Sequence, residues 1–158
     1  MSAPIRLTVY GAAQPQGNKT GFARQGKVVM VEGRRPEARE AFKSWREAVA
    51  TAGRDWQREH GQELLDEPLA LRAVFHLPKP SSAPKWKLWA RGRPDVDKLA
   101  RAVLDALTGV VWIDDSRVVS LHVSKPYAID GPPRAEIEIE PWGALERKHT
   151  VSTTTGAA

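Results

Sequence analysis

An amphipathic helix with aspartates at its start and beyond its end is the feature that most constrains this sequence. Between residues 95 and 107, apolar residues recur at intervals of three and four and form one stripe: Val96, Leu99, Ala100, Val103, Leu104 and Leu107. Pro94 precedes a predicted N-cap at Asp95, and Gly109 stands where a C-terminal glycine is expected. The segment is therefore predicted to be a packed helix with Asp95 and Asp97 in its first turn.

The aspartates have structural interpretations as well as a chemical one. Asp95 alone is typical of a cap, and Asp97 alone complements the helix dipole. Asp97, Arg101 and Asp105 are four residues apart and would suit a solvated salt-bridge row. The pair at 114–115, predicted to open the next strand, also suits a turn. Together, however, these carboxylates are the oxygen ligands that Mg²⁺ prefers, so their convergence would create a metal site.

Three runs stand out in this region: Pro94-Asp95-Val96-Asp97-Lys98-Leu99, Asp105-Ala106-Leu107 and Trp112-Ile113-Asp114-Asp115-Ser116-Arg117-Val118-Val119. In combination they resemble the RusA family of Holliday junction resolvases. The element order is also loosely similar over residues 4–141. The family consists of small Mg²⁺-dependent endodeoxyribonucleases of bacteria and phages. Its essential carboxylates match Asp95, Asp97 and Asp115 here, and Asp114 is expected to face away because neighbouring strand residues point to opposite sides.

The resemblance implies a specific activity and specific partners. The chain is expected to cut four-way DNA junctions during recombination and repair, using Mg²⁺ or, as an alternative, Mn²⁺. A two-fold symmetric junction needs paired cuts, so a homodimer is expected. The expected location is the cytoplasm of a bacterium, whether the gene is bacterial or carried by a phage.

Two positions depart from the family pattern. Lys98 stands where the family usually has Asn, and Arg101 stands where it has an essential Lys. Arg cannot lose its proton at working pH, so Arg101 is expected to act electrostatically on a phosphate, with Lys98 on the same helical face. These departures keep a second hypothesis open, namely a non-catalytic protein that binds DNA junctions or single strands. A third hypothesis reads Asp-x-Asp as the nucleotide-sugar motif of a glycosyltransferase, although the chain is short for that.

Charge distribution favours a polyanionic partner. The net charge is +5, yet none of the nineteen acidic residues lies between Ser2 and Val31 or between Pro68 and Pro94. The predicted DNA-contacting cations are Lys19, Arg24, Lys79, Lys85, Lys87, Arg91, Arg93, Lys98 and Lys125. Trp86 and Trp89 lie among these cations and either anchor their loop to the body or stack on unpaired DNA bases.

Composition and periodicity predict one domain at residues 1–142, of the α/β (α+β) class, and a disordered tail at 143–158. Strands are predicted at 5–10, 27–31, 69–77, 119–123 and 135–140, and helices at 37–62 and 95–107. The order is β-β-α-β-α-β-β, with one mixed sheet of about five strands. Strand 27–31 would complete a long hairpin with 5–10, and the glutamates of 135–140 would mark a solvated edge. No stretch is apolar enough for a membrane span, and Cys is absent.

Overall fold

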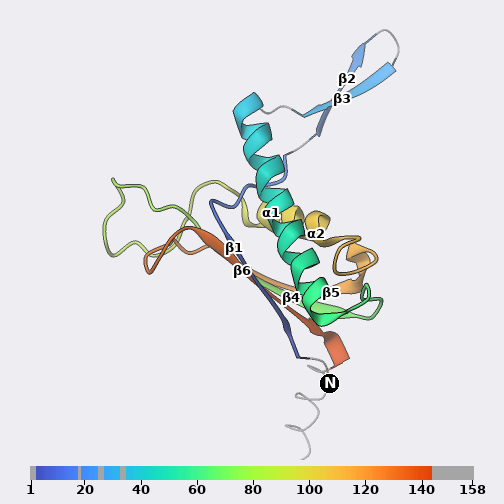
Figure 1. Ribbon diagram of the computed structural model, residues 1–158. Coiled ribbons are helices and arrows are strands. Elements are labelled where there is room, and N and C mark those ends of the chain that lie inside the picture. The colour runs from blue at the N-terminus through green and yellow to red at the C-terminus, as the bar shows by residue number, and fades with distance from the viewer. Residues whose placement is uncertain (1–2, 18, 25–26, 33–34, 144–158) are drawn as a thin grey trace, which may run out of the picture.

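Four strands build the main sheet, and two helices cover one of its faces (Figure 1). The computed structural model describes residues 3–17, 19–24, 27–32 and 35–143. The strands are β1 (Ile5–Tyr10), β4 (Leu69–His76), β5 (Val118–Ser124) and β6 (Arg134–Pro141), in the order β1-β6-β4-β5. β6 is antiparallel to both of its neighbours, while β4 and β5 are parallel. The predicted mixed α+β fold is confirmed, but the main sheet has four strands instead of five.

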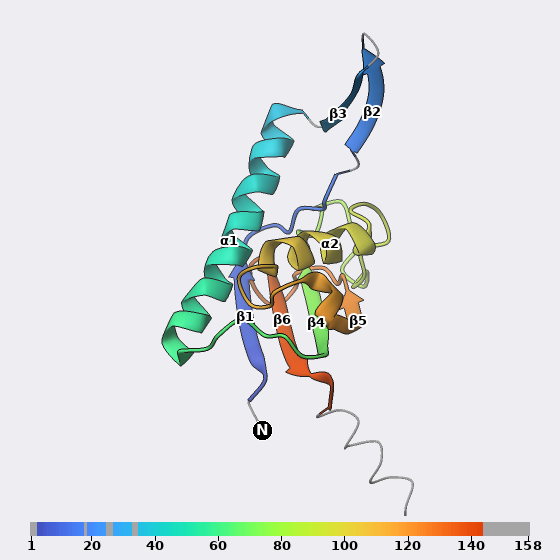
Figure 2. The ribbon, with the colours of Figure 1, turned by 90° about the vertical axis from the view of Figure 1, so that its right-hand side faces the viewer.

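The helices α1 (Pro36–His60) and α2 (Val96–Leu107) pack on each other above this sheet. Figure 2 shows α2 crossing in front of the strands from the β5 side towards α1. The largest fully buried side chains are Trp112, Phe75, Leu69, Leu71, Leu99, Leu107, Ile137, Ile139, Val49, Val103 and Val111. They come from both helices, from the sheet and from the loop after α2. Burial of each large side chain contributes about 1.5–3 kcal/mol, so this cluster holds α2 against the sheet.

The helix α1 was predicted from the sequence but ends earlier than expected. Phe42, Trp45 and Val49 recur at intervals of three and four residues, and all three are buried. The helix was predicted to run to Gln62, and it stops at His60. The reason is Gly61, which adopts a left-handed φ of 58° and caps the helix, a conformation that glycine takes at little cost.

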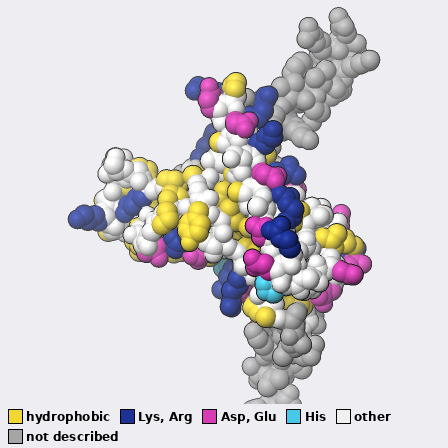
Figure 3. Space-filling view, viewed as in Figure 1, with side chains coloured by type: hydrophobic (Ala, Val, Ile, Leu, Met, Phe, Trp, Pro, Cys, Tyr) yellow, Lys and Arg dark blue, Asp and Glu magenta, His cyan; other side chains and the backbone are white. Residues whose placement is uncertain are grey.

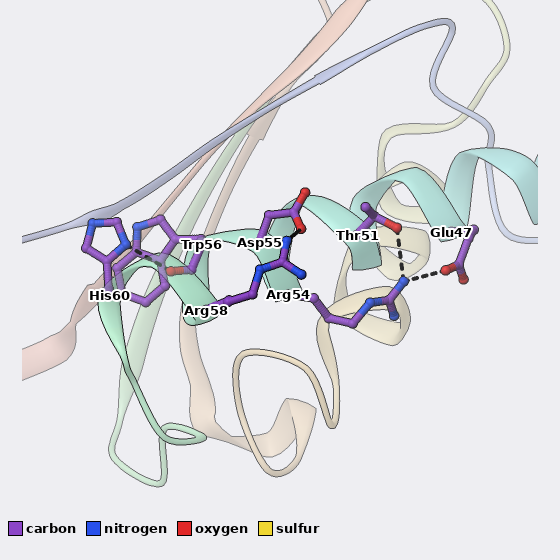
Figure 4. A network of polar contacts seen from close by, with 7 residues as sticks. All are labelled: Glu47, Thr51, Arg54, Asp55, Trp56, Arg58 and His60. Atoms are coloured by element: carbon purple, nitrogen blue, oxygen red, sulfur yellow. Dashed lines mark hydrogen bonds and ion pairs between the residues drawn. The ribbon is translucent and has the colours of Figure 1, made fainter.

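Ion pairs between nearby residues line the solvent side of α1 (Figure 4). Arg54 donates to Glu47 and, at 3.0 Å, to the hydroxyl oxygen of Thr51. At the C-terminal end, His60 stacks on Trp56 with ring centroids 4.4 Å apart. Exposed pairs of this kind stabilise a protein by less than about 1 kcal/mol, so the buried seam holds α1 in place.

A separate hairpin corrects the prediction for the N-terminal region. Strands β2 (Lys19–Arg24) and β3 (Lys27–Glu32) pair with each other in a two-stranded sheet, which extends beyond the start of α1 (Figures 1 and 2). The prediction that strand 27–31 pairs with β1 was therefore wrong, and no strand was predicted where β2 forms. The segment that forms β2 lacks the alternation of apolar and polar residues that marks a half-buried strand, so the pattern did not reveal it.

The strand β6 lies inside the sheet, so the prediction of a solvated edge was wrong. β1 pairs with it from Ile5↔Ile139 to Tyr10↔Arg134. Its glutamates do lie on the face away from the helices, where Glu138 accepts a hydrogen bond of 2.7 Å from Arg6. This bond, more than the charge of Arg6, holds the pKa of Glu138 below its usual value. Glutamates suit this central strand because arginines pair with them.

The start of β5 also differs from the prediction. Asp114 and Asp115 do not open the strand. Residues Asp115–Arg117 form a 3₁₀ turn, η1, and β5 begins at Val118. The cause is local, because the Asp114 carboxylate accepts a hydrogen bond from the backbone N–H of Ser116 and caps the turn. Strand alternation therefore does not decide where Asp114 points.

Within the described residues, no helix is long and apolar enough to cross a membrane. The tail predicted at 143–158 lies outside the described residues except for Gly143.

Candidate nucleic-acid and metal site

The start of α2 presents two carboxylates to solvent. The buried stripe of α2, with Leu99 and Val103 at 0% exposure, turns the opposite side of the helix outward. Asp95 is the N-cap residue and Asp97 lies in the first turn, and both are exposed. The Asp95 side chain makes no capping hydrogen bond, so its carboxylate is available for another partner. The predicted N-cap position of Asp95 is thus confirmed, although its side chain does not cap the helix.

The neighbouring cation partly balances this charge. Lys98 Nζ lies 3.4 Å from Asp95 Oδ2, three residues away along the helix. Both residues line a pocket of about 730 Å³ between the start of α2 and the loops after β1 and β4. Arg93 and Gln16 line the same pocket. An anionic group that enters this pocket would meet Lys98 and Arg93 beside a carboxylate, which suits a phosphate held together with a cation.

Arg101 lies one turn beyond Asp97 and is exposed. The alternative interpretation of Asp97, Arg101 and Asp105 was a salt-bridge row. Across residues 3–17 and 35–143, whose side chains the structure describes, no ion pair joins these three. The guanidinium of Arg101 thus remains available on the same side of α2 as Asp97.

Asp115 is exposed as the first residue of η1, while Asp114 is engaged in the cap. Hydrogen bonding with Ser116, and to a smaller extent the charge of Arg117, lowers the pKa of Asp114. Arg117 Nε also donates to Asp66 Oδ1 at 2.6 Å, which ties η1 to the connection between α1 and β4. Asp115 therefore stands on an anchored turn with its carboxylate in solvent.

The three predicted metal ligands do not form one cluster. Asp115 precedes β5, whereas the start of α2 lies near the far end of that strand. A seven-residue strand spans roughly 20 Å. Among the described side chains, no three carboxylates or imidazoles are arranged to hold a metal ion. Asp95 and Asp97 lie two residues apart at the start of α2, and Asp115 lies apart from both, so its role as a third ligand stays a prediction.

Lys125 has a structural position that the sequence did not indicate. Its ammonium donates to the carbonyl oxygen of Gly92 at 2.6 Å and to that of Pro94 at 2.9 Å. These bonds join the end of β5 to the backbone immediately before Asp95. Lys125 was predicted to contact DNA, which stays a prediction, while its observed contacts hold the backbone immediately before Asp95.

Most of the remaining predicted cations lie on one loop that ends beside the pocket. Residues 77–93 form a loop, here called the basic loop, that extends away from the sheet (Figure 1). It contains five of the predicted DNA-contacting residues, Lys79, Lys85, Lys87, Arg91 and Arg93, and ends directly before α2. Lys19 and Arg24 occupy the two ends of β2, where only the backbone is described.

Sequence reasoning missed Gln16. Its backbone N–H donates to the Lys98 carbonyl at 3.0 Å, which attaches the loop after β1 to α2. Its side-chain Oε1 is buried beside the pocket and has no hydrogen-bond partner among the described residues. A glutamine in a Gly- and Pro-rich loop gives no periodic signal, so only the tertiary contact with α2 identifies it.

Two comparisons with known proteins bear on the identity of the chain. Residues 12–140 match the protein family described as Endodeoxyribonuclease RusA. The chain is also similar to the uncharacterized protein YqaN of Bacillus subtilis (strain 168), with 34% identity over 145 residues, covering 85% of this chain and 94% of the relative. The family match includes β4, both helices, the basic loop and the aspartates at 95, 97 and 115.

Proposed function

Because this chain belongs to the RusA family of endodeoxyribonucleases, we propose that it cuts phosphodiester bonds at four-way DNA junctions in a Mg²⁺-dependent reaction. The observation that carries the proposal is the pair of exposed carboxylates, Asp95 and Asp97, at the end of a cationic loop. An acid-free loop attracts the DNA backbone, and oxygen ligands beside it suit a divalent cation.

The donor chemistry of this site fits Mg²⁺. Mg²⁺ is usually bound by one or two protein carboxylates, with substrate phosphate and water in the remaining positions. Asp95 and Asp97 would hold the ion, and Asp115 is proposed as a further ligand. When bound, the ion would lower the pKa of a water molecule and stabilise charge on the phosphate.

The cations of α2 have a separate role in this proposal. A guanidinium group is a cation and a poor base, so Arg101 offsets the negative charge of the scissile phosphate. Lys98 lines the pocket and neutralises part of the Asp95 charge at 3.4 Å. Lys19 and Arg24 on the hairpin, with Lys79, Lys85, Lys87, Arg91 and Arg93 of the basic loop, would contact phosphates and orient the DNA without reading its sequence.

A second copy of the chain is part of the proposal, because a junction needs two cuts. The edge strand β5 offers a surface for it. Leu121 pairs with the buried Leu71, so it points to the helix side of the sheet, yet it is 46% exposed. Val119, two residues earlier, is 54% exposed. Apolar side chains beside an unpaired strand edge favour association, and a C2 pair through β5 would cover them.

Cleavage of a labelled synthetic four-way junction, with Mg²⁺ and with chelator, tests the proposal. Wild-type protein is expected to cut the junction only with the metal and to leave a linear duplex of the same sequence intact. Asp97→Asn should abolish cutting and leave junction binding as tight as in wild type or tighter, because a negative charge near the phosphates is removed. Asp55→Asn is the matched control, since Asp55 lies on α1, does not line the pocket at the start of α2 and is paired with Arg58 (Figure 4).

The second candidate function is binding of junctions or single strands without cleavage. The contact between Lys98 and Asp95 favours it, because an ammonium group beside a carboxylate competes with a metal ion. The same assay separates the two functions. Metal-independent binding without any nicking would support the binding protein, and Lys98→Asn would then be the variant to test for a gain of cutting.

A further inference from the structure

Two tryptophans of the basic loop are exposed to an unusual degree. Trp86 is 77% exposed and Trp89 is 58% exposed, whereas Trp45 and Trp112 are buried in the core. Leu88, between the two, is 46% exposed. Figure 3 shows hydrophobic side chains gathered where this loop leaves the body, with Lys or Arg towards its outer end. Large aromatic groups are costly to leave in water, so a patch of this kind marks a binding surface.

The loop is held firmly although its tryptophans are exposed. The backbone N–H of Ala90 donates to the Lys125 carbonyl at 3.2 Å, and that of Tyr127 donates to the Leu88 carbonyl at 2.8 Å. Ala90 and Tyr127 are buried and attach the loop to the body. The interpretation of the tryptophans as anchors is therefore unsupported, because other residues attach the loop. The aromatic rings are presented on a backbone already ordered, which lowers the entropic cost of binding.

The positive charge of the loop around the two tryptophan rings favours an anionic ligand. The loop contains no acidic residue, and Lys85 and Lys87 flank Trp86 directly. Neither lysine has an ion-pair partner among the side chains that the structure describes. Cores of protein–protein interfaces are depleted in lysine, whereas single-stranded nucleic acid is bound by aromatic rings interleaved with cations. The charge therefore favours DNA over a protein partner.

We propose that Trp86 and Trp89 form a stacking platform for unpaired DNA bases at the branch point of the substrate. Bases in a linear duplex are stacked and paired, so the rings would distinguish branched from linear DNA. The loop leads through Arg93 to Asp95 and is tied there by Lys125, so a base held on the platform places the adjoining backbone near the carboxylates. This platform rests on the proposed function and adds a source of selectivity to it.

Binding measurements with a salt series test the platform. Stacking of a base contributes about 1–3 kcal/mol, which converts to a loss of roughly five- to 160-fold in affinity for junction or single-stranded DNA in Trp86→Ala/Trp89→Ala. The salt dependence should be unchanged, because every cation that neutralises a phosphate is still present. Affinity for linear duplex should change less than about two-fold. Replacement of both residues by Phe keeps a flat ring and should restore most of the affinity.

Two control variants separate stacking from charge and from general loss of apolar surface. Lys85→Met/Lys87→Met should weaken binding to junction and duplex alike and reduce the salt slope by about 0.9 for each phosphate that is no longer neutralised. Ile129→Ala removes another exposed apolar side chain, 62% accessible, from the neighbouring turn and should leave affinity unchanged. Quenching of tryptophan fluorescence by single-stranded DNA is expected in wild type and should disappear when both rings are replaced by Phe.

The outcomes distinguish this inference from the nuclease proposal. If wild type cuts junctions while Trp86→Ala/Trp89→Ala binds them equally well, the platform is refuted and the nuclease stands. If wild type leaves junctions uncut but binds single strands through the two tryptophans, the nuclease is refuted and the platform stands. A change in oligomeric mass of the double variant, with DNA affinity unaltered, would show that the patch contacts protein and would also refute the platform.

Discussion

Replacement of Lys125 by Met distinguishes two roles for this lysine, positioning the carboxylates or contacting DNA. Its ammonium donates to the carbonyl oxygens of Gly92 at 2.6 Å and of Pro94 at 2.9 Å, immediately before Asp95. Met keeps most of the aliphatic stem and has no N–H donor. The variant therefore lacks both hydrogen bonds, while the packing of the stem changes little.

The exposure of the two carbonyl groups sets the expected magnitude. A hydrogen bond from a charged group contributes about 1.5–3 kcal/mol. Gly92 is exposed, so water replaces the ammonium at its carbonyl, whereas Pro94 is half-buried. We expect a loss equal to one such bond, about 1.5–3 kcal/mol. For a chain of this size each kcal/mol lowers Tm by roughly 2–4 °C, so Tm should fall by roughly 3–12 °C.

Urea denaturation measures this loss, with Lys43→Met as the control because Lys43 is an exposed lysine on α1. The salt dependence of junction binding gives the second measurement. If Lys125 is held by the two carbonyls, the slope of log K against log salt concentration should not change in Lys125→Met. If Lys125 instead neutralises a phosphate, its removal would make the slope shallower by about 0.9.

The positioning role would be refuted by a variant as stable as wild type whose salt slope is shallower by the amount expected for one phosphate. That result would mean that the ammonium leaves the backbone carbonyls and binds a phosphate. The prediction that Lys125 binds DNA would then be confirmed.

Three further predictions concern packing and pH. Trp112→Ala should lower the free energy of unfolding by about 3–5 kcal/mol in urea titrations, because Trp112 is 0% exposed. Gly53→Ala should be neutral or destabilising by up to about 2 kcal/mol, since a Cβ would lie 3.0 Å from Leu107 and overpacking offsets the gain in helix propensity. A variant more stable than wild type would contradict this. The pKa of Glu138 is lowered in the folded protein, so its bond with Arg6 stabilises the fold above pH 4.5, the ordinary pKa, and this contribution is lost as pH falls through the folded pKa. Glu138→Gln should therefore lose stability at neutral pH and depend less steeply on acid pH, as measured by unfolding across that range.

The residues of α2 show what the spacing of apolar residues along the sequence can predict. The three- and four-residue spacing of Leu99, Val103 and Leu107 predicts both the helix and its buried face, and these side chains are fully buried. Periodicity suffices here because it reflects the geometry of one helix. It also places Asp95 and Asp97 at the exposed start of α2, so the chemistry of this part of the site could be predicted.

The strands show where local pattern fails. The segment of β2 has no alternating apolar and polar residues, so no strand was predicted there. The strand β6 carries glutamates on one face, so it was predicted to be a solvated edge. In the structure, β6 lies between β1 and β4, and its glutamates at 136 and 138 pair with Arg134 of the same strand and Arg6 of β1. Which strand pairs with which depends on contacts between distant segments, and a pattern read along one strand does not contain them.

The sequence by itself determined which side chains have the chemistry to hold a divalent cation and attract DNA, because carboxylates and acid-free cationic segments keep those properties in any fold. The tertiary structure alone decided which of them meet. In the folded chain, Lys125 binds the backbone before Asp95, and Asp114 caps the 3₁₀ turn. Asp115 lies apart from Asp95 and Asp97. Trp86 and Trp89 are exposed on an ordered loop. These outcomes depend on strand order and loop attachment, which arise only when the core is packed.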